Sequence, residues 1–311
     1  MTAAVAAPTE RLSAWDRFLF EAESPSPLAL LRVVWGVLAT LWAISLLADI
    51  DPFMTRGELY YGGSNATAYW NPLEWTHWHQ APMAVCILLI VTGITTSIGL
   101  FSRASSLIAV VCMLSLQRTN PIVMNSGDFV LRHVGIAVAL GPSGLLLSLD
   151  ALRARRRAKA KGEERPAPRR APWALRFLQL DIAIGYFLSM WPKLRGDTWH
   201  DGTAMGMALR ITDVQRFAPP QWLFDQSLFL NAVTWGTLAF EASFLFLVWK
   251  RRWRPWVLGV GVLFHLGIDV FIDVGFFSYA MVASYIAFIP ADVADRIVDR
   301  IRARLPDRLV S

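Results

Sequence analysis

Nine ionisable residues lie within or beside strongly apolar segments of this sequence. An ionisable group costs roughly 2.5–3.5 kcal/mol or more inside a bilayer, so each of them is a candidate functional residue. The nine residues are Asp128, Arg132, His133, Asp181, Lys193, Glu241, His265, Asp269 and Asp273. Proton transfer is the chemistry that such a set of carboxylates, imidazoles and one amine could perform.

Lys193 follows Pro192 at the end of an apolar segment. Partial burial disfavours the charged form of a lysine, so its neutral amine could act as a base. The alternative is a lysine at a helix end that extends its ammonium group to the membrane surface. Asp197, Trp199 and Gly202 follow closely and predict a tight cap over this position.

His265, Asp269 and Asp273 fall at positions i, i+4 and i+8, which form one stripe of a helix. A carboxylate close to an imidazole can fix its tautomer and raise its basicity. The alternative is a buried histidine that is satisfied by a single partner. The stripe therefore predicts either a proton-handling pair or a packed histidine.

Four other intramembrane residues have structural alternatives. Asp128 and Arg132 are four residues apart and can pair on one helix face, so we expect a structural ion pair there. Glu241 and Asp181 could face the interior of a helix bundle, where a carboxylate either takes part in function or hydrogen-bonds within the bundle.

The remaining motifs do not indicate a metal or nucleotide site. His77 and His79 form an H-x-H pair, and two ligands are too few for a metal. Cys86 and Cys112 fall in apolar segments and are expected to be reduced packing residues. The sequence contains no Walker A, G-x-G-x-x-G, G-x-S-x-G or H-E-x-x-H pattern.

The elements that must position these residues are membrane helices. The chain has 311 residues, 55% of them apolar and 17% charged, and its mean hydropathy is +0.41. This composition excludes a disordered chain and a disulfide-rich module and disfavours a soluble enzyme. It predicts an all-α, polytopic helical bundle of about eight transmembrane helices. The predicted spans are Leu28–Ala48, Pro82–Leu100, Ala104–Leu116, Phe129–Leu149, Trp173–Met190, Leu228–Trp249, Pro255–Phe271 and Phe276–Ile289.

The distribution of positive charge supports this topology. The formal net charge is +6, a value that could indicate nucleic-acid binding. With eight spans and both termini in the cytoplasm, however, about two thirds of the 30 Lys and Arg residues fall on the cytoplasmic side. The charge is thus a topology signal, and we expect membrane lipids, not nucleic acid, as partners.

We expect three regions along the chain. Residues 1–27 form a cytoplasmic or interfacial segment whose apolar positions recur at helical spacing. Residues 28–290 form the transmembrane domain, which includes a flexible basic cytoplasmic loop at 151–171. Residues 291–311 form a cytoplasmic tail. The outer segments 49–81 and 193–227 are rich in Trp, Pro and Gly and are expected to form packed caps.

Two segments together resemble a known family. One is the sequence WPKLRGDTWHDG, from Trp191 to Gly202. The other combines Phe264 and His265 with GFFSY, which starts at Gly275. Both resemble the membrane domain of vitamin K-dependent gamma-carboxylases, which is shared with bacterial proteins of the horizontally transferred transmembrane (HTTM) domain family. The similarity extends over nearly the whole chain and implies a multi-pass protein of the bacterial cell membrane.

The resemblance implies roles for particular residues. A lysine followed by leucine is taken as the carboxylase base that deprotonates vitamin K hydroquinone, and Lys193 occupies that place. His265 matches a histidine that organises the pocket. Where the family carries Asn-His, Asn125 is followed by Ser126, so that histidine is absent here. The expected catalytic residues are therefore Lys193 and His265. The expected substrate-binding residues are Asn125, Asp181, Trp199, Glu241, Asp269 and Tyr279.

Two functions follow as alternatives. The first is an enzyme that oxygenates a quinol, such as a reduced quinone of the vitamin K or menaquinone type, or another lipid-soluble substrate, with Lys193 as base. The second is a non-enzymatic membrane scaffold, or a lipid- or quinone-binding partner of another protein. A transporter is less favoured, because the sequence lacks evident inverted repeats and paired broken helices.

Overall fold

The computed structural model describes residues 13–55, 70–120 and 123–304. Within these ranges the protein is all-helical, with two isolated β-bridges, Glu23 to Arg170 and Gln215 to Ile272. The longer helices are α2 (Ser26–Leu46), α4 (Ala81–Ile98), α5 (Ser102–Thr119), α6 (Ser126–Leu140), α7 (Leu149–Ala160), α8 (Trp173–Lys193), α12 (Ser227–Leu247), α13 (Arg254–Phe271) and α15 (Ala291–Ala303).

Short helices complete the fold. They are α1 (Ala14–Phe20), α3 (Ile50–Met54), α9 (Asp197–His200), α10 (Ala204–Ala208), α11 (Gln221–Phe224) and α14 (Phe277–Ser284), with 3₁₀ turns η1 (Leu47–Asp49), η4 (Pro72–Trp75), η6 (Ser143–Leu145), η7 (Thr212–Val214) and η8 (Tyr285–Phe288). Helix α1 begins with a reciprocal capping box between Ser13 and Asp16. Residues 1–12 and 305–311, which belong to the predicted end regions, lie outside the described residues.

Four helical segments of the described chain are long and apolar enough to cross a membrane, or five if the bent pair Phe277–Phe288 and Ala291–Ala303 counts as one span. The four are Ser26–Met54, Ala81–Ile98, Ser227–Leu247 and Arg254–Phe271. Each of the eight predicted spans contains a helix, but α6 has only 15 residues, and α5 and α8 are long enough but less apolar. The membrane-protein class is therefore confirmed, whereas the count of eight and the sides of the termini stay predictions.

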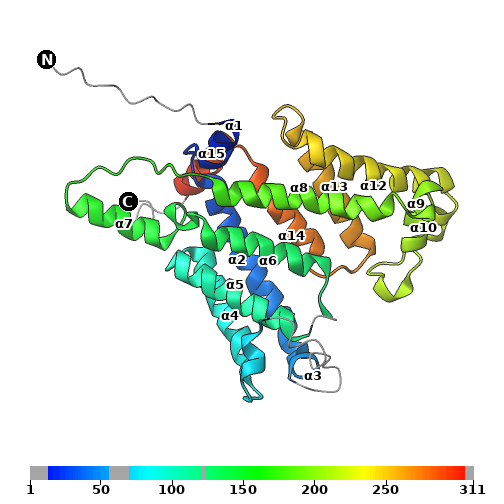
Figure 1. The fold of residues 1–311 in the computed structure, drawn as a ribbon, viewed down its shortest axis with the longest axis horizontal. Coiled ribbons are helices and arrows are strands. Elements are labelled where there is room, and N and C mark those ends of the chain that lie inside the picture. The colour runs from blue at the N-terminus through cyan, green and yellow to red at the C-terminus, as the bar shows by residue number, and fades with distance from the viewer. Residues whose placement is uncertain (1–12, 56–69, 121–122, 305–311) are drawn as a thin grey trace.

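Helix α2 is the centre of the bundle and contacts α4, α6, α14 and α15 (Figure 1). Small residues allow the closest approach. A Cβ atom added to Gly36 would lie 2.6 Å from the backbone nitrogen of Ser97, and one added to Gly93 would lie 2.4 Å from the Thr40 hydroxyl. Such small-residue contacts let helices pack backbone to backbone where the lipid gives no hydrophobic drive. On its other side, Trp35 donates from Nε1 to the Leu131 carbonyl of α6 at 2.7 Å.

A second group of helices carries the candidate site. Helix α8 contacts α12, and α13 contacts both α12 and α14 (Figure 1). Helices α9, α10 and α11 follow α8 and form a cap, with a small apolar cluster of Leu209, Leu223 and Leu230. Residues 193–227 thus form short helices, of which α10 packs on α12, as the expected cap requires. Of the other expected cap, 49–81, residues 56–69 lie outside the described residues.

Two sequence expectations about the basic segment are wrong. In the span predicted for 129–149, the helix stops at Leu140, because Gly141 and Pro142 interrupt it. The predicted flexible loop begins as helix α7, since Ala, Arg and Lys are strong helix formers. Ser148 caps its first turn by accepting from the Ala151 amide at 2.9 Å, and Gly162 lies beyond its end with φ of +72°.

Asp150 anchors the start of α7 to the start of α5. Burial opposes its charge, but hydrogen bonds from the amide and hydroxyl of Ser102 and the amide of Phe101 outweigh it and lower the pKa of Asp150 below its ordinary 3.8. A lowered folded-state pKa stabilises the fold above the unfolded-state pKa, and this contribution is lost as the pH falls through the folded-state pKa.

We therefore expect Asp150→Asn to lower the melting temperature at pH 7 and to have a shrinking effect below about pH 4. Thermal melts of both proteins in the same detergent, at a series of pH values, measure this. An equal difference at pH 7 and pH 3 would contradict the electrostatic account and leave only a packing effect.

Candidate active site

Lys193 lies in the last turn of α8 and points to α12. Its Nζ atom forms an ion pair with Oε1 of Glu241 and donates to the Ser189 hydroxyl at 3.0 Å. Ser189 in turn donates to the same Glu241 oxygen at 3.1 Å. Glu241 is 3% exposed, whereas the Lys193 side chain is 22% exposed, so the pair extends from the interior toward the surface. The simple alternative of a lysine reaching away to the membrane surface does not describe this geometry.

Trp199 covers the amine from the cap. The Lys193 Nζ atom lies 5.1 Å from the centre of the Trp199 ring, within the range of a cation–π interaction. Trp199 belongs to α9, which begins four residues after Lys193. Three of the predicted residues, Lys193, Glu241 and Trp199, therefore meet at one place.

His265 lies on α13, deep in the bundle, and is 1% exposed. Its Nε2 atom is 2.9 Å from the hydroxyl of Tyr186, which also hydrogen-bonds to the hydroxyl of Tyr285. Phe264 and Phe277 flank the imidazole, with ring centroids 5.2 and 5.3 Å away. The structure thus places a histidine and two tyrosines in one hydrogen-bonded chain within an aromatic shell.

The two groups are neighbours. The Tyr186 ring packs edge-on against Phe240, next to Glu241, with centroids 5.5 Å apart. Tyr186 and Lys193 lie seven residues apart on α8, which places them on one face of that helix. Together the five polar side chains form what we call the α8–α12–α13 centre: Lys193, Glu241, Tyr186, His265 and Tyr285.

Two buried polar atoms of this centre have no hydrogen-bond partner among the described residues. They are Oε2 of Glu241 and Nδ1 of His265. A buried polar atom without a partner costs about 1–3 kcal/mol and is rare in folded proteins. Both atoms are therefore free to bind a polar group of a ligand or water.

Tyr186 is expected to be the more important of the two tyrosines for stability. Tyr186→Phe removes a hydroxyl that joins His265 and Tyr285, so two buried polar atoms lose a partner at a cost of about 2 kcal/mol. Tyr285→Phe leaves Tyr186 bonded to His265 and should cost about half as much. Thermal melts of the two variants give the order, and a larger loss for Tyr285→Phe would contradict the arrangement.

Asp269 and Tyr279 form a separate cluster. The Tyr279 hydroxyl donates to Asp269 Oδ2 at 2.8 Å, and Arg216 lies 3.4 Å from the same oxygen and 2.9 Å from Asp273. The Gly275 amide and Arg216 lower the pKa of Asp273, and the Asp273 hydrogen bond raises that of Arg216. Helix α13 ends at Phe271, so Asp273 lies beyond it and the expected helical stripe is not formed. Asp269 and Asp273 both pair with Arg216 from the cap, and the imidazole bonds to Tyr186 instead.

The hydrogen-bond and ion-pair partners of Asp181 and Asn125 do not include Lys193. Asp181 pairs with His133 at 3.0 Å, and both side chains are more than 40% exposed. Asn125 caps α6, accepting from the amides of Gly127 and Asp128 at 2.7 and 3.3 Å. Their proposed substrate-binding roles stay predictions.

Asp128 does not make the ion pair expected with Arg132. Its Oδ1 atom accepts a hydrogen bond from Trp42 Nε1, 2.6 Å away, and its Oδ2 atom accepts one from the Asn125 amide nitrogen, 2.8 Å away. The described residues give no Asp128–Arg132 salt bridge, and Arg132 donates to Gln117 at 3.4 Å. Among all the described residues, no group of three or more His, Cys, Asp or Glu side chains is placed to hold a metal ion. Cys86 and Cys112 are free and buried.

Sequence reasoning missed Ser189, Tyr186, Tyr285 and Arg216. Ser189 and Tyr186 precede Lys193 by four and seven residues, which is the spacing of one helix face, so α8 carried a signal for both. Tyr285 and Arg216 reach their partners only through tertiary packing, and no local spacing indicates them.

A comparison with family models finds the HTTM domain over residues 20–293. Neither the curated proteins nor the solved structures include a significant match to the chain. The matched range contains α2 to α14, the whole α8–α12–α13 centre and the start of α15. The apolar helices and this match agree, and the chain is a membrane protein that belongs to the HTTM domain family.

Proposed function

We propose that this protein is a membrane enzyme that deprotonates and oxygenates a quinol at the α8–α12–α13 centre. The observation that carries the proposal is the Lys193–Glu241 pair, which joins a buried carboxylate to a half-buried amine and leaves one carboxylate oxygen without a partner. Intramembrane ionisable pairs of this kind are typical of proton-handling sites. The sequence resemblance to gamma-carboxylases suggests the same chemistry.

The pair can hold its shared proton in two ways, as ammonium and carboxylate or as amine and carboxylic acid. Both forms have no net charge, which suits a low-dielectric site. In the second form Lys193 is a neutral amine and can take the proton of a quinol hydroxyl. The resulting ammonium then stabilises the quinolate oxygen by charge and hydrogen bonding.

Each surrounding side chain has a defined task in this proposal. Trp199 covers the amine and limits its contact with water. The aromatic residues Phe240, Phe264 and Phe277 provide an apolar surface beside the polar atoms. His265 offers the unpartnered Nδ1 atom for a hydrogen bond to the substrate, while Tyr186 fixes its orientation through Nε2.

The overall reaction is balanced with dioxygen as the co-substrate. A quinol and one O2 yield a quinone epoxide and one water, so the two hydroxyl hydrogens leave as water. The protein contributes the first proton transfer and the exclusion of solvent.

Mass spectrometry of lipid extracts from the purified protein tests the proposal directly. We expect a quinone or quinol to co-purify, and we expect the protein with reduced menaquinone or vitamin K hydroquinone to consume O2 and form epoxide. A protein that retains a quinone but turns none over would be the quinone-binding alternative. Absence of both retention and turnover would favour a membrane scaffold.

A further inference from the structure

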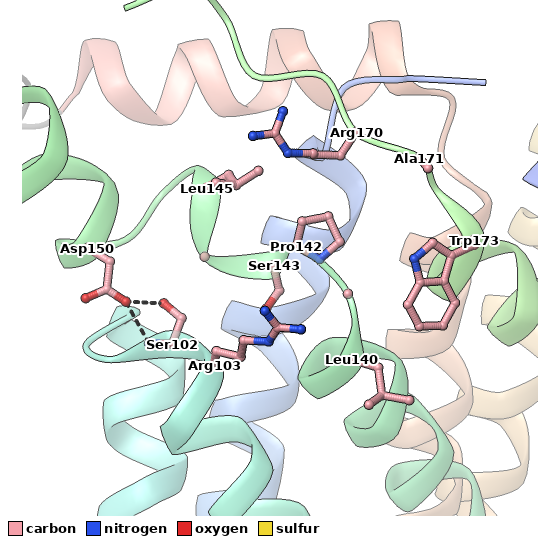
Figure 2. Close-up of a pocket in the computed structure, with 12 residues that line it drawn as sticks. Ser102, Arg103, Leu140, Pro142, Ser143, Leu145, Asp150, Arg170, Ala171 and Trp173 are labelled. Carbon is pink, nitrogen blue, oxygen red and sulfur yellow. Dashed lines mark hydrogen bonds between the residues drawn. The ribbon is translucent and has the colours of Figure 1, made fainter. Parts of the chain in front are cut away.

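A cavity of about 480 Å³ lies at the other end of α8 from Lys193. The two ends of this 21-residue helix are about 30 Å apart at 1.5 Å per residue. The cavity is formed by the start of α5, the turn between α6 and α7, and the residues that lead into α8 (Figure 2). Its volume is in the usual range for a small-molecule site.

Two arginines line this cavity. Arg103 projects from the first turn of α5, and Arg170 belongs to the segment before α8; Figure 2 shows them below and above the turn that carries Pro142 and Ser143. Within the described residues, the Arg103 side chain makes no hydrogen bond and no ion pair. Arg170 donates from Nη1 to the neighbouring Arg169 carbonyl at 2.8 Å, which leaves its other guanidinium donors available.

One carboxylate, Asp150, also lines the cavity, but its oxygens are already engaged. They accept hydrogen bonds from the Phe101 amide and from the amide and hydroxyl of Ser102. The lining therefore carries a net positive charge with free guanidinium donors, the chemistry that binds phosphate oxygens in bidentate fashion.

Apart from Ser102 and Ser143, the rest of the lining carries no polar side chain except the Trp173 indole, and its larger side chains are Leu140, Pro142, Leu145 and Trp173. A tryptophan beside arginines at the end of a membrane helix is typical of the headgroup level of a bilayer. A molecule that combines an anionic phosphate with an apolar part would match both halves of the lining.

We propose that this cavity binds the phosphate group of an anionic ligand, held between Arg103 and Arg170. A phospholipid headgroup and a soluble phosphate share this chemistry. Trp173 and Leu140 would contact the glycerol and upper acyl region of a lipid. The site is independent of the proposed quinol reaction, because it uses none of the residues near Lys193.

Native mass spectrometry of the full-length protein in detergent tests the site, with phosphatidylglycerol, phosphatidylcholine and inorganic phosphate as separate probes. We expect phosphatidylglycerol to bind more tightly than phosphatidylcholine. The double variant Arg103→Gln/Arg170→Gln should weaken phosphatidylglycerol binding about 25-fold, or about fivefold for each arginine. The backbone bridge between Arg170 and Glu23 is retained in this variant.

The matched control is Arg157→Gln/Arg165→Gln, which removes the same charge from exposed positions outside the cavity lining. Arg103 and Arg170 are also exposed, so the two double variants differ in whether the arginines line the cavity. The control should change the affinity less than about twofold, because its arginines act on the bound phosphate only through screened charge. If inorganic phosphate binds with the same dependence on the two arginines and the lipid does not, the site takes a soluble phosphate. Equal losses in both double variants, or equal binding of the two lipids without phosphate binding, would overturn the proposal.

Discussion

Replacing Lys193 with alanine is expected to reduce quinol turnover at least about 10²-fold, because a positioned acid–base group contributes about 10²–10⁴-fold to rate. The variant also leaves Glu241 as a buried carboxylate without its cation. O2 consumption and epoxide formation by the purified protein with a reduced quinone are the measurements. The loss should appear in kcat, since the group acts on the reacting proton.

Lys193→Arg separates the chemistry of the amine from its structural role. Arginine can keep the ion pair with Glu241, but its guanidinium does not lose a proton in proteins and cannot act as the base. We expect this variant to melt close to the wild type and to be as inactive as the alanine variant. Full activity of Lys193→Arg would contradict the assignment of the base.

Arg195→Ala is the matched control for the position. Arg195 is an exposed cation two residues along the chain, and it lies 4.7 Å from the Trp191 ring centre. It has the same kind of aromatic contact as Lys193 but lies outside the α8–α12–α13 centre. We expect nearly unchanged turnover, and a loss equal to that of Lys193→Ala would indicate that the segment acts only through its fold.

Much of the fold follows from composition. A single mostly apolar segment in lipid can satisfy its own backbone hydrogen bonds only as a helix, and each predicted span contains a helix in the structure. The proximity of Trp199 to Lys193 was also predictable, because only a short turn separates α8 from α9. These features depend on short stretches of chain.

The partners of the site residues could not be predicted in the same way. Glu241 and Lys193 are 48 residues apart and meet because α8 packs on α12. Asp269 is four residues from His265, yet its partners are Tyr279, ten residues later, and Arg216 of the cap. Helical spacing shows which residues share one face of a helix, but it does not show which neighbouring segment packs against that face.

Arg32 is the second residue for which we expect a large effect, in this case on stability. It lies in α2 with 0% exposure and donates to four backbone carbonyls. The acceptors are Ser143, Thr96, Ser97 and Leu147, of which Ser143, Ser97 and Leu147 lie 3.2, 2.8 and 2.5 Å from it. Thr96 and Ser97 belong to the last turn of α4, where carbonyls lack helical partners and favour a cation.

Arg32 therefore joins α2, the end of α4 and the turn between α6 and α7. Arg32→Met keeps much of the side-chain volume and removes every donor, so the carbonyl of Ser143, which is in a buried contact, and the carbonyls of Ser97 and Leu147, which are in part-buried contacts, lose this partner. We expect a destabilisation of about 3 kcal/mol or more, because each unsatisfied buried acceptor costs about 1–3 kcal/mol. Thermal unfolding monitored by size-exclusion chromatography in detergent measures the loss.

Arg32→Lys should not restore stability, because one ammonium group cannot reach carbonyls on both the end of α4 and the α6–α7 turn as the planar guanidinium does. The matched control is Arg153→Met, which removes an exposed arginine that lies 5.7 Å from the Phe101 ring centre. This control should cost less than about 1 kcal/mol. A lysine variant as stable as the wild type would mean that charge alone, and not the four-carbonyl geometry, holds these segments together.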